Sequence, residues 1–122
     1  MNRLTPEAVG QLGRPEGTIV FRYTFSAPLM QAPPSPVVIL DEQAGGVAAR
    51  LELSPSLKLR HVRGGEGQGT RTAEVDLRPL LGTQALQIFL LWSSIEVGLT
   101  VGDAEKQSEL LSGKSRETGG AM

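Results

Sequence analysis

One stretch of the chain concentrates the side chains that could bind a ligand. Four cationic residues lie around the only histidine, His61, or just beyond the glycine-rich segment that follows it. Guanidinium and ammonium groups bind phosphate, sulfate and carboxylate, and an imidazole can titrate near neutral pH. The candidate ligand-binding residues are therefore Lys58, Arg60, His61, Arg63 and Arg71.

Two interpretations of this basic cluster are open. Across a hairpin the five side chains could share one face and form a patch for an anionic sugar, a phosphate or an acidic partner. Alternatively, they belong to a solvated face on which Glu52, Glu66 and Glu74 balance the charge. We favour the solvated face and keep the patch as the candidate site.

Catalytic chemistry finds little support in the sequence. His61 has no Gly-x-Ser-x-Gly or His-x-x-x-His motif around it, and the chain has no cysteine. The three aspartates, Asp41, Asp76 and Asp103, fall at predicted strand ends, where turn chemistry accounts for them. We expect a non-enzymatic protein without metal or cofactor, in which His61 is a surface or rim residue.

The glycine-rich segment and the tryptophan each have a ligand-binding interpretation and a purely structural one. The segment Gly64 to Gly69 fails the Gly-x-Gly-x-x-Gly pattern of phosphate-binding loops. We therefore expect a hairpin loop, which could still contact a ligand. Trp92 could stack on a sugar ring. Its alternation with Leu86, Ile88 and Leu90 instead predicts a core position.

The elements that would position these residues are strands. Alternation of apolar and polar side chains is clearest from Thr18 to Phe25, and turn signals separate it from the runs that follow. A slip in the alternation near His61 and Val62 suggests a β-bulge. About seven strands are predicted, over residues 18–25, 37–40, 47–53, 57–60, 70–77, 86–92 and 95–101.

The last two predicted strands form a hairpin around Ser93 and Ser94. Alternation points Leu86, Ile88, Leu90 and Trp92 to one side, and it matches them with Ile95, Val97, Leu99 and Val101 on the return strand. Phe89 and Leu91 are apolar on the opposite side, so we expect the first strand to be covered on both faces.

These strands predict an all-β fold, an antiparallel β-sandwich over residues 18–103. Residues 1–17 form a lead-in in which Thr5-Pro6-Glu7 signals a short helix. Residues 104–122 form a polar C-terminal tail. For this tail a short helix from Asp103 to Leu111 and an edge strand near residues 108–112 both remain open.

Bulk properties exclude several classes of partner. The 122 residues include 12 basic and 13 acidic side chains, which argues against nucleic-acid binding. The longest apolar run, Ile88 to Trp92, is far shorter than the roughly 20 residues of a membrane-spanning helix. The N-terminus has no apolar signal-peptide region, so a soluble protein is expected, with its compartment undetermined.

Part of the chain resembles a known family. Glu16-Gly17-Thr18-Ile19-Val20-Phe21, the hairpin over residues 51–59 and the late strand that ends in tryptophan resemble the concanavalin A-like or laminin G-like domains, over residues 16–103. The resemblance implies a lectin-like jelly roll that recognises glycans or proteins. Some members bind calcium, but no cluster of Asp or Asn here matches such a site.

Our expectation is a binding module that recognises a carbohydrate or another glycan, with a protein ligand as a further possibility. The alternative is a structural or assembly protein of the capsid, tail or adhesin type, in which β-sandwiches associate into homo-oligomers. The chain's five aromatic residues favour this alternative, because few aromatics are left for a ligand site.

Overall fold

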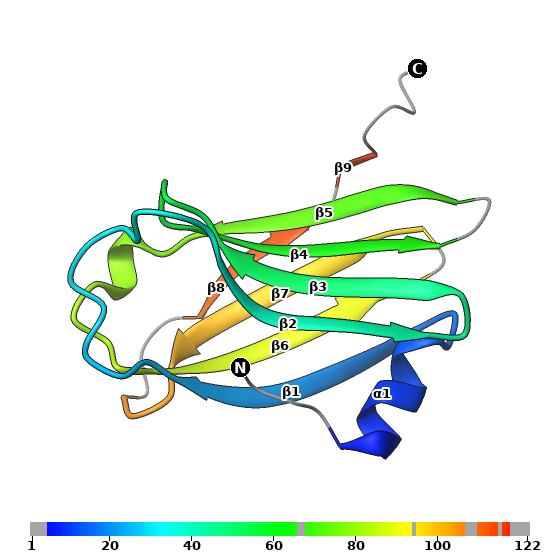
Figure 1. The fold of residues 1–122 in the computed structure, drawn as a ribbon, viewed down its shortest axis with the longest axis horizontal. Coiled ribbons are helices and arrows are strands. Elements are labelled where there is room, and N and C mark those ends of the chain that lie inside the picture. Colours follow the sequence, from blue (N-terminus) through cyan, green and yellow to red (C-terminus); the bar gives the residue numbers. More distant parts are fainter. Residues whose placement is uncertain (1–4, 66–67, 94, 107–109, 115, 118–122) are drawn as a thin grey trace.

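The protein is a sandwich of two antiparallel β-sheets (Figure 1). The structure, a computed structural model, describes residues 5–65, 68–93, 95–106, 110–114 and 116–117. Its elements are α1 (Pro6–Leu12), β1 (Gly17–Thr24), β2 (Val37–Ala44), β3 (Val47–Leu53), β4 (Lys58–Gly65), β5 (Gln68–Asp76), the 3₁₀ turn η1 (Arg78–Leu80), β6 (Ala85–Trp92), β7 (Val97–Asp103), β8 (Leu111–Lys114) and β9 (Arg116–Glu117).

The first sheet, sheet A, has the strand order β1-β6-β7-β8, and the second, sheet B, has the order β2-β3-β4-β5-β9. The seven predicted strands correspond to β1–β7, so the all-β sandwich is confirmed. No helix in the described part of the chain is long and apolar enough to cross a membrane.

Strict alternation builds the core between the sheets. In sheet A, Ile19 of β1 lies opposite Leu90 of β6, which lies opposite Leu99 of β7, and all three side chains are buried. Leu51 of β3 and Leu59 of β4 are buried on the facing side of sheet B. Trp92 is 4% exposed, so its predicted place in the core is confirmed.

The helix α1 lies against β1 and β2, near one open side of the sandwich (Figure 1). Its predicted start is confirmed: the Thr5 hydroxyl oxygen accepts a hydrogen bond from the Ala8 N–H at 3.2 Å, and Pro6 occupies the first turn. Leu12, at the end of the helix, is fully buried and joins the core.

The start of the C-terminal tail belongs to the sandwich. β8 pairs with β7 in sheet A, and β9 pairs with β5 in sheet B, so the edge-strand alternative is the one adopted. Residues 107–109 lie outside the described residues. The predicted edge strand begins among them, and the predicted helix would run through them. Gly113 of β8 lies so close to the backbone of Glu74 in β5 that no side chain would fit there.

Three details of the sequence prediction are wrong. Ile95 is 73% exposed rather than inward, because the Ser93 hydroxyl accepts hydrogen bonds from the N–H groups of Ile95 and Glu96 and the turn extends to residue 96. Leu91 is 36% exposed, so β6 is not covered on both faces. The bulge in the β4–β5 pair lies between Arg63 and Gly65, past the predicted position.

Candidate functional site

The structure divides the predicted basic cluster between the two faces of sheet B. Register and burial place Lys58 and Arg60 on the outer face, whereas His61, Arg63 and Arg71 lie on the face toward sheet A. The five side chains, which across a hairpin could have shared one face, are therefore not brought together. The alternation along β4 that turns Leu59 inward also turns its neighbours at 61 and 63 inward.

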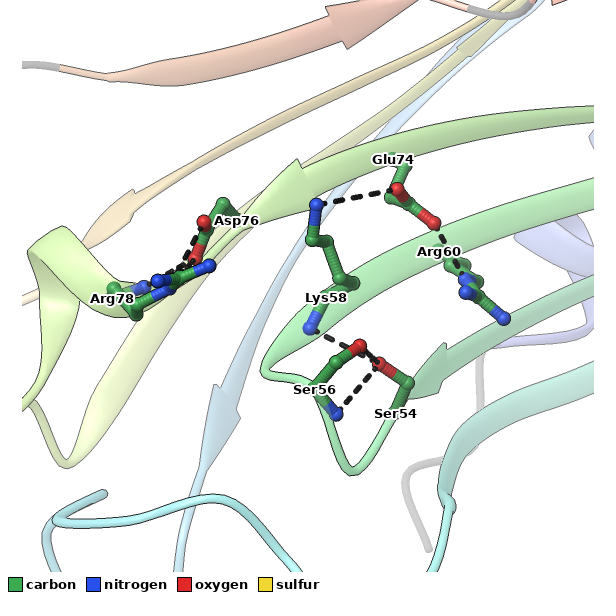
Figure 2. Close-up of polar contacts among 7 residues, drawn as sticks. All are labelled: Ser54, Ser56, Lys58, Arg60, Glu74, Asp76 and Arg78. Carbon is green, nitrogen blue, oxygen red and sulfur yellow. Dashed lines mark hydrogen bonds and ion pairs between the residues drawn. The ribbon is translucent and has the colours of Figure 1, made fainter.

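On the outer face, Glu74 of β5 lies between the two cations (Figure 2). Its carboxylate is 2.7 Å from the Arg60 Nε and 3.7 Å from the Lys58 Nζ. Arg50 pairs with Glu52 at 3.3 Å on the same sheet. Such exposed ion pairs contribute at most about 1 kcal/mol each. Their two carboxylates offset most of the positive charge that an anion-binding patch would need.

The turn before β4 is also visible in Figure 2. The Ser54 hydroxyl oxygen accepts hydrogen bonds from the N–H groups of Ser56 and Lys58, which fixes the start of the strand. At the end of β5 the Asp76 carboxylate accepts from the backbone N–H of Arg78 and pairs with its guanidinium. This backbone hydrogen bond, with the guanidinium, lowers the pKa of Asp76.

Asp103 has the same role at the end of β7. Its carboxylate accepts a hydrogen bond from the Glu105 N–H at 2.9 Å and another from the Thr83 hydroxyl at 3.2 Å. The backbone bond is the main cause of its lowered pKa. Turn chemistry therefore accounts for Asp76 and Asp103, whereas Asp41 lies inside β2 rather than at a strand end.

His61 is fully buried, which overturns its prediction as a surface or rim residue. Its Nδ1 lies 3.0 Å from the carbonyl oxygen of Gly98, so Nδ1 carries the proton and donates. Nε2 is buried without a hydrogen-bond partner. Burial lowers the pKa of His61 to about 4, so the ring is neutral at pH 7. The imidazole joins the two sheets and is not accessible to a ligand.

Arg63 lies at one end of the sandwich, across from Trp92 of the other sheet. Its guanidinium carbon is 4.8 Å from the indole centroid, within the range of a cation–π contact. The carbonyl oxygen of Arg14 accepts hydrogen bonds from both the Arg63 Nη2 and the Trp92 Nε1, each at 2.9 Å. These contacts fix the guanidinium and attach the segment before β1 to the core.

The outer face of sheet A carries a groove of about 610 Å³ that the sequence did not reveal. One row of residues crosses it: Thr18 of β1, Leu91 of β6, Gly98 of β7 and Lys114 of β8 are successive partners in register. Thr100 and Ser112 form the next row, and their hydroxyl oxygens are 3.0 Å apart. Gly98 is the sequence signal that was missed, since glycine inside a strand often marks a close approach by a ligand.

A second hollow, of about 380 Å³, lies beside Arg63 at the end of the sandwich. Its described lining includes Arg14, Arg63 and Arg71, several glycines and Ser93. Ser93 also lines the groove on sheet A. Two of the five predicted site residues are thus brought together here, away from Lys58 and Arg60.

No group of three His, Asp or Glu side chains in the described ranges is placed to hold a metal ion. Comparison of the chain with protein-family models, with curated proteins and with solved structures finds no match.

Proposed function

We propose that the protein is a non-catalytic binding module that holds a glycan in the groove on the outer face of sheet A. The observation that carries the proposal is the groove itself. Its volume, about 610 Å³, falls within the roughly 300–1,000 Å³ of small-ligand sites. It crosses all four strands of a sheet whose inner face is packed against the core, so the scaffold beneath it is rigid.

The lining of the groove suits a sugar better than a wholly apolar ligand. Leu91 offers an apolar floor for the C–H face of a ring, and it is exposed because Gly98 beside it has no side chain. The hydroxyls of Thr18, Thr100 and Ser112 can donate and accept hydrogen bonds.

Charged groups also line this surface, near the start of β7. Lys114 lies on β8, and Glu96 lies at the turn before β7; both line the groove. A ligand with many hydroxyls can accept from the ammonium group and donate to the carboxylate. Both charges are exposed to solvent, so they contribute mainly to orientation of the ligand.

The proposal is tested with a glycan array followed by solution titration of the glycans that bind. A Gly98→Leu substitution fills the groove with a side chain, and the backbone at Gly98 is not in the left-handed region that only glycine favours. Ala48→Leu, on an exposed position of β3 in the other sheet, is the matched control. Binding should fall at least tenfold in Gly98→Leu and persist in Ala48→Leu; a panel without any bound glycan would sink the proposal.

The assembly alternative also has a specific observation in its favour. Val20 is 48% exposed and lies opposite half-buried Phe89, which is two residues from exposed Leu91 on β6. These side chains form an apolar strip on the outer face of sheet A, and exposed apolar patches often mark interfaces. Light scattering decides between the candidates: Val20→Lys should dissociate an oligomer formed through this strip, whereas a strict monomer at high concentration contradicts assembly.

A further inference from the structure

The hollow at the end of the sandwich has an unbalanced charge. Three arginines, Arg14, Arg63 and Arg71, line it, and no carboxylate is among its described lining residues. Elsewhere in the described chain Arg50, Arg60 and Arg78 each have a carboxylate partner within 3.3 Å. The hollow therefore differs from the surroundings of these three arginines, where a carboxylate lies beside each guanidinium.

Two of these arginines are direct neighbours. Arg63 of β4 lies opposite Arg71 of β5 in register, so both side chains project from the same face of the sheet. Like charges at directly opposite positions destabilise a strand pair. Over residues 5–65, 69–93, 95–106 and 110–114, whose side chains the structure describes, neither guanidinium forms an ion pair with a carboxylate. Over these ranges the repulsion is thus left uncompensated.

Arg63 is held in a fixed orientation by groups that do not neutralise it. Its Nη2 donates to the Arg14 carbonyl, its guanidinium carbon lies over the Trp92 ring, and its Nη1 is buried without a hydrogen-bond partner. Burial and, to a smaller extent, the charge of Arg71 lower its pKa. A guanidinium stays charged at neutral pH even so. Within the side chains described over residues 5–65, 69–93, 95–106 and 110–114, a positive charge without a counter-charge therefore remains beside the hollow.

We propose that Arg63 and Arg71 form a binding site for an oxyanion group, either phosphate, sulfate or carboxylate. The planar forks of two guanidinium groups match the oxygens of such a group and give strong, charge-assisted hydrogen bonds. The glycines that line the hollow, among them Gly46 and Gly69, have no atom within 4 Å of where a Cβ would stand, so a ligand can approach. The site is separate from the glycan proposal and stands without it.

The single tryptophan provides a local readout, because Arg63 lies over it. Sodium sulfate or phosphate is titrated against chloride at constant ionic strength while the indole N–H resonance of Trp92 is followed. A saturable shift is expected. In Arg71→Gln the affinity should fall about tenfold or more, since one charge-assisted hydrogen-bonding partner is lost. Arg60→Gln, the same change on the outer face of β4, should bind as the wild type does.

Thermal unfolding gives an independent readout, because Arg71→Gln should weaken anion binding without lowering the unfolding temperature of the anion-free protein. Without oxyanion, Arg71→Gln should unfold at the same or a higher temperature than the wild type, because it removes the repulsion. With sulfate the wild type and Arg60→Gln should gain more stability than Arg71→Gln does. A titration with the sulfate ester of a sugar and with its parent sugar identifies the source: tighter binding of the ester than of inorganic sulfate assigns a glycan-borne group, and equal binding assigns the free anion.

Two results would overturn the site. One is the absence of a saturable indole shift in the wild type, or an equal shift in Arg71→Gln. The other concerns Glu117 of β9, whose backbone lies opposite that of Arg71 in register. If sulfate bound only to Glu117→Gln, the chain's own carboxylate would neutralise the arginine pair and no ligand would be needed.

Discussion

The Nδ1 of His61 in β4 lies 3.0 Å from the carbonyl oxygen of Gly98 in β7, so a buried neutral imidazole links the inner faces of the two sheets. Gly98 also lines the groove on the outer face of sheet A, where its missing side chain leaves space for a ligand. One glycine thus connects the core to the proposed ligand groove.

The stability of the fold should fall between about pH 6.5 and pH 4 because of His61. Its pKa is 6.5 in the unfolded chain and about 4 in the folded protein, so the unfolded state binds the proton first as the pH falls. Protonation therefore favours unfolding in this window, by about 2 kcal/mol at pH 5. Urea unfolding at pH 7 and pH 5 measures the difference.

The control for this pH dependence is His61→Leu, which removes the only histidine. Its stability should change much less between pH 6.5 and pH 5. Asp76 and Asp103, with pKa values lowered from 3.8, lose their stabilising contribution only as the pH falls below that range. A wild-type protein whose stability is flat from pH 7 to pH 5 would show that His61 is not buried in its neutral form.

Much of the sandwich is predictable because its strands alternate regularly. Ile19, Leu90 and Leu99 are apolar at the expected period, and all three lie in the core. The sequence prediction for His61 is wrong because a histidine beside cationic residues favours a surface position, whereas its alternation with Leu59 places it inward. Its hydrogen-bond partner is 37 residues away, so no local pattern indicates it.

Other features depend on the assembled sheet and could not be predicted. β8, the sequence Leu-Ser-Gly-Lys, has low intrinsic strand propensity and is held by pairing with β7 and by close contact with β5. The groove needs the register of four strands, since Thr18 and Lys114 are distant in sequence. The hollow beside Arg63 and Arg71 depends on a bulge whose position the sequence only approximates.

Truncating the middle of the core should be costly. Leu90→Ala removes a fully buried side chain between Ile19 and Leu99 and should lower the free energy of unfolding by about 2–5 kcal/mol. Chemical denaturation measures the loss. Leu110→Ala is the matched control, because this leucine is 55% exposed and the change should be much smaller. Equal losses in the two variants would contradict the assignment of the core.

Two glycines should respond differently to the same substitution. A Cβ on Gly17 would stand 2.6 Å from the Cζ2 of Trp92, so Gly17→Ala must displace a buried ring and should cost about 1–3 kcal/mol. A Cβ on Gly98 would contact the Leu91 Cβ at 3.4 Å and fits without displacement. Gly98→Ala should change stability by about 0.5 kcal/mol or less. Unfolding midpoints that rank the two variants the other way would contradict this packing.

The contacts of Trp92 and Arg63 should be coupled energetically. Trp92→Phe loses the hydrogen bond to the Arg14 carbonyl and part of the cation–π contact, and should cost about 1–3 kcal/mol. A double-mutant cycle with Arg63→Met should give a coupling of about 0.5 kcal/mol or more. Additive losses would mean that the guanidinium and the indole do not interact in solution.

The most direct test of the proposed function is to locate the bound glycan by NMR. Backbone amide resonances are followed while a glycan from the array is titrated into the protein. The largest shifts should map to Leu91, Gly98, Thr100 and Ser112 on the outer face of sheet A, and they should disappear in Gly98→Leu. Shifts centred instead on Arg60 and Glu74 of sheet B, or shifts that persist in Gly98→Leu, would contradict the groove as the ligand site.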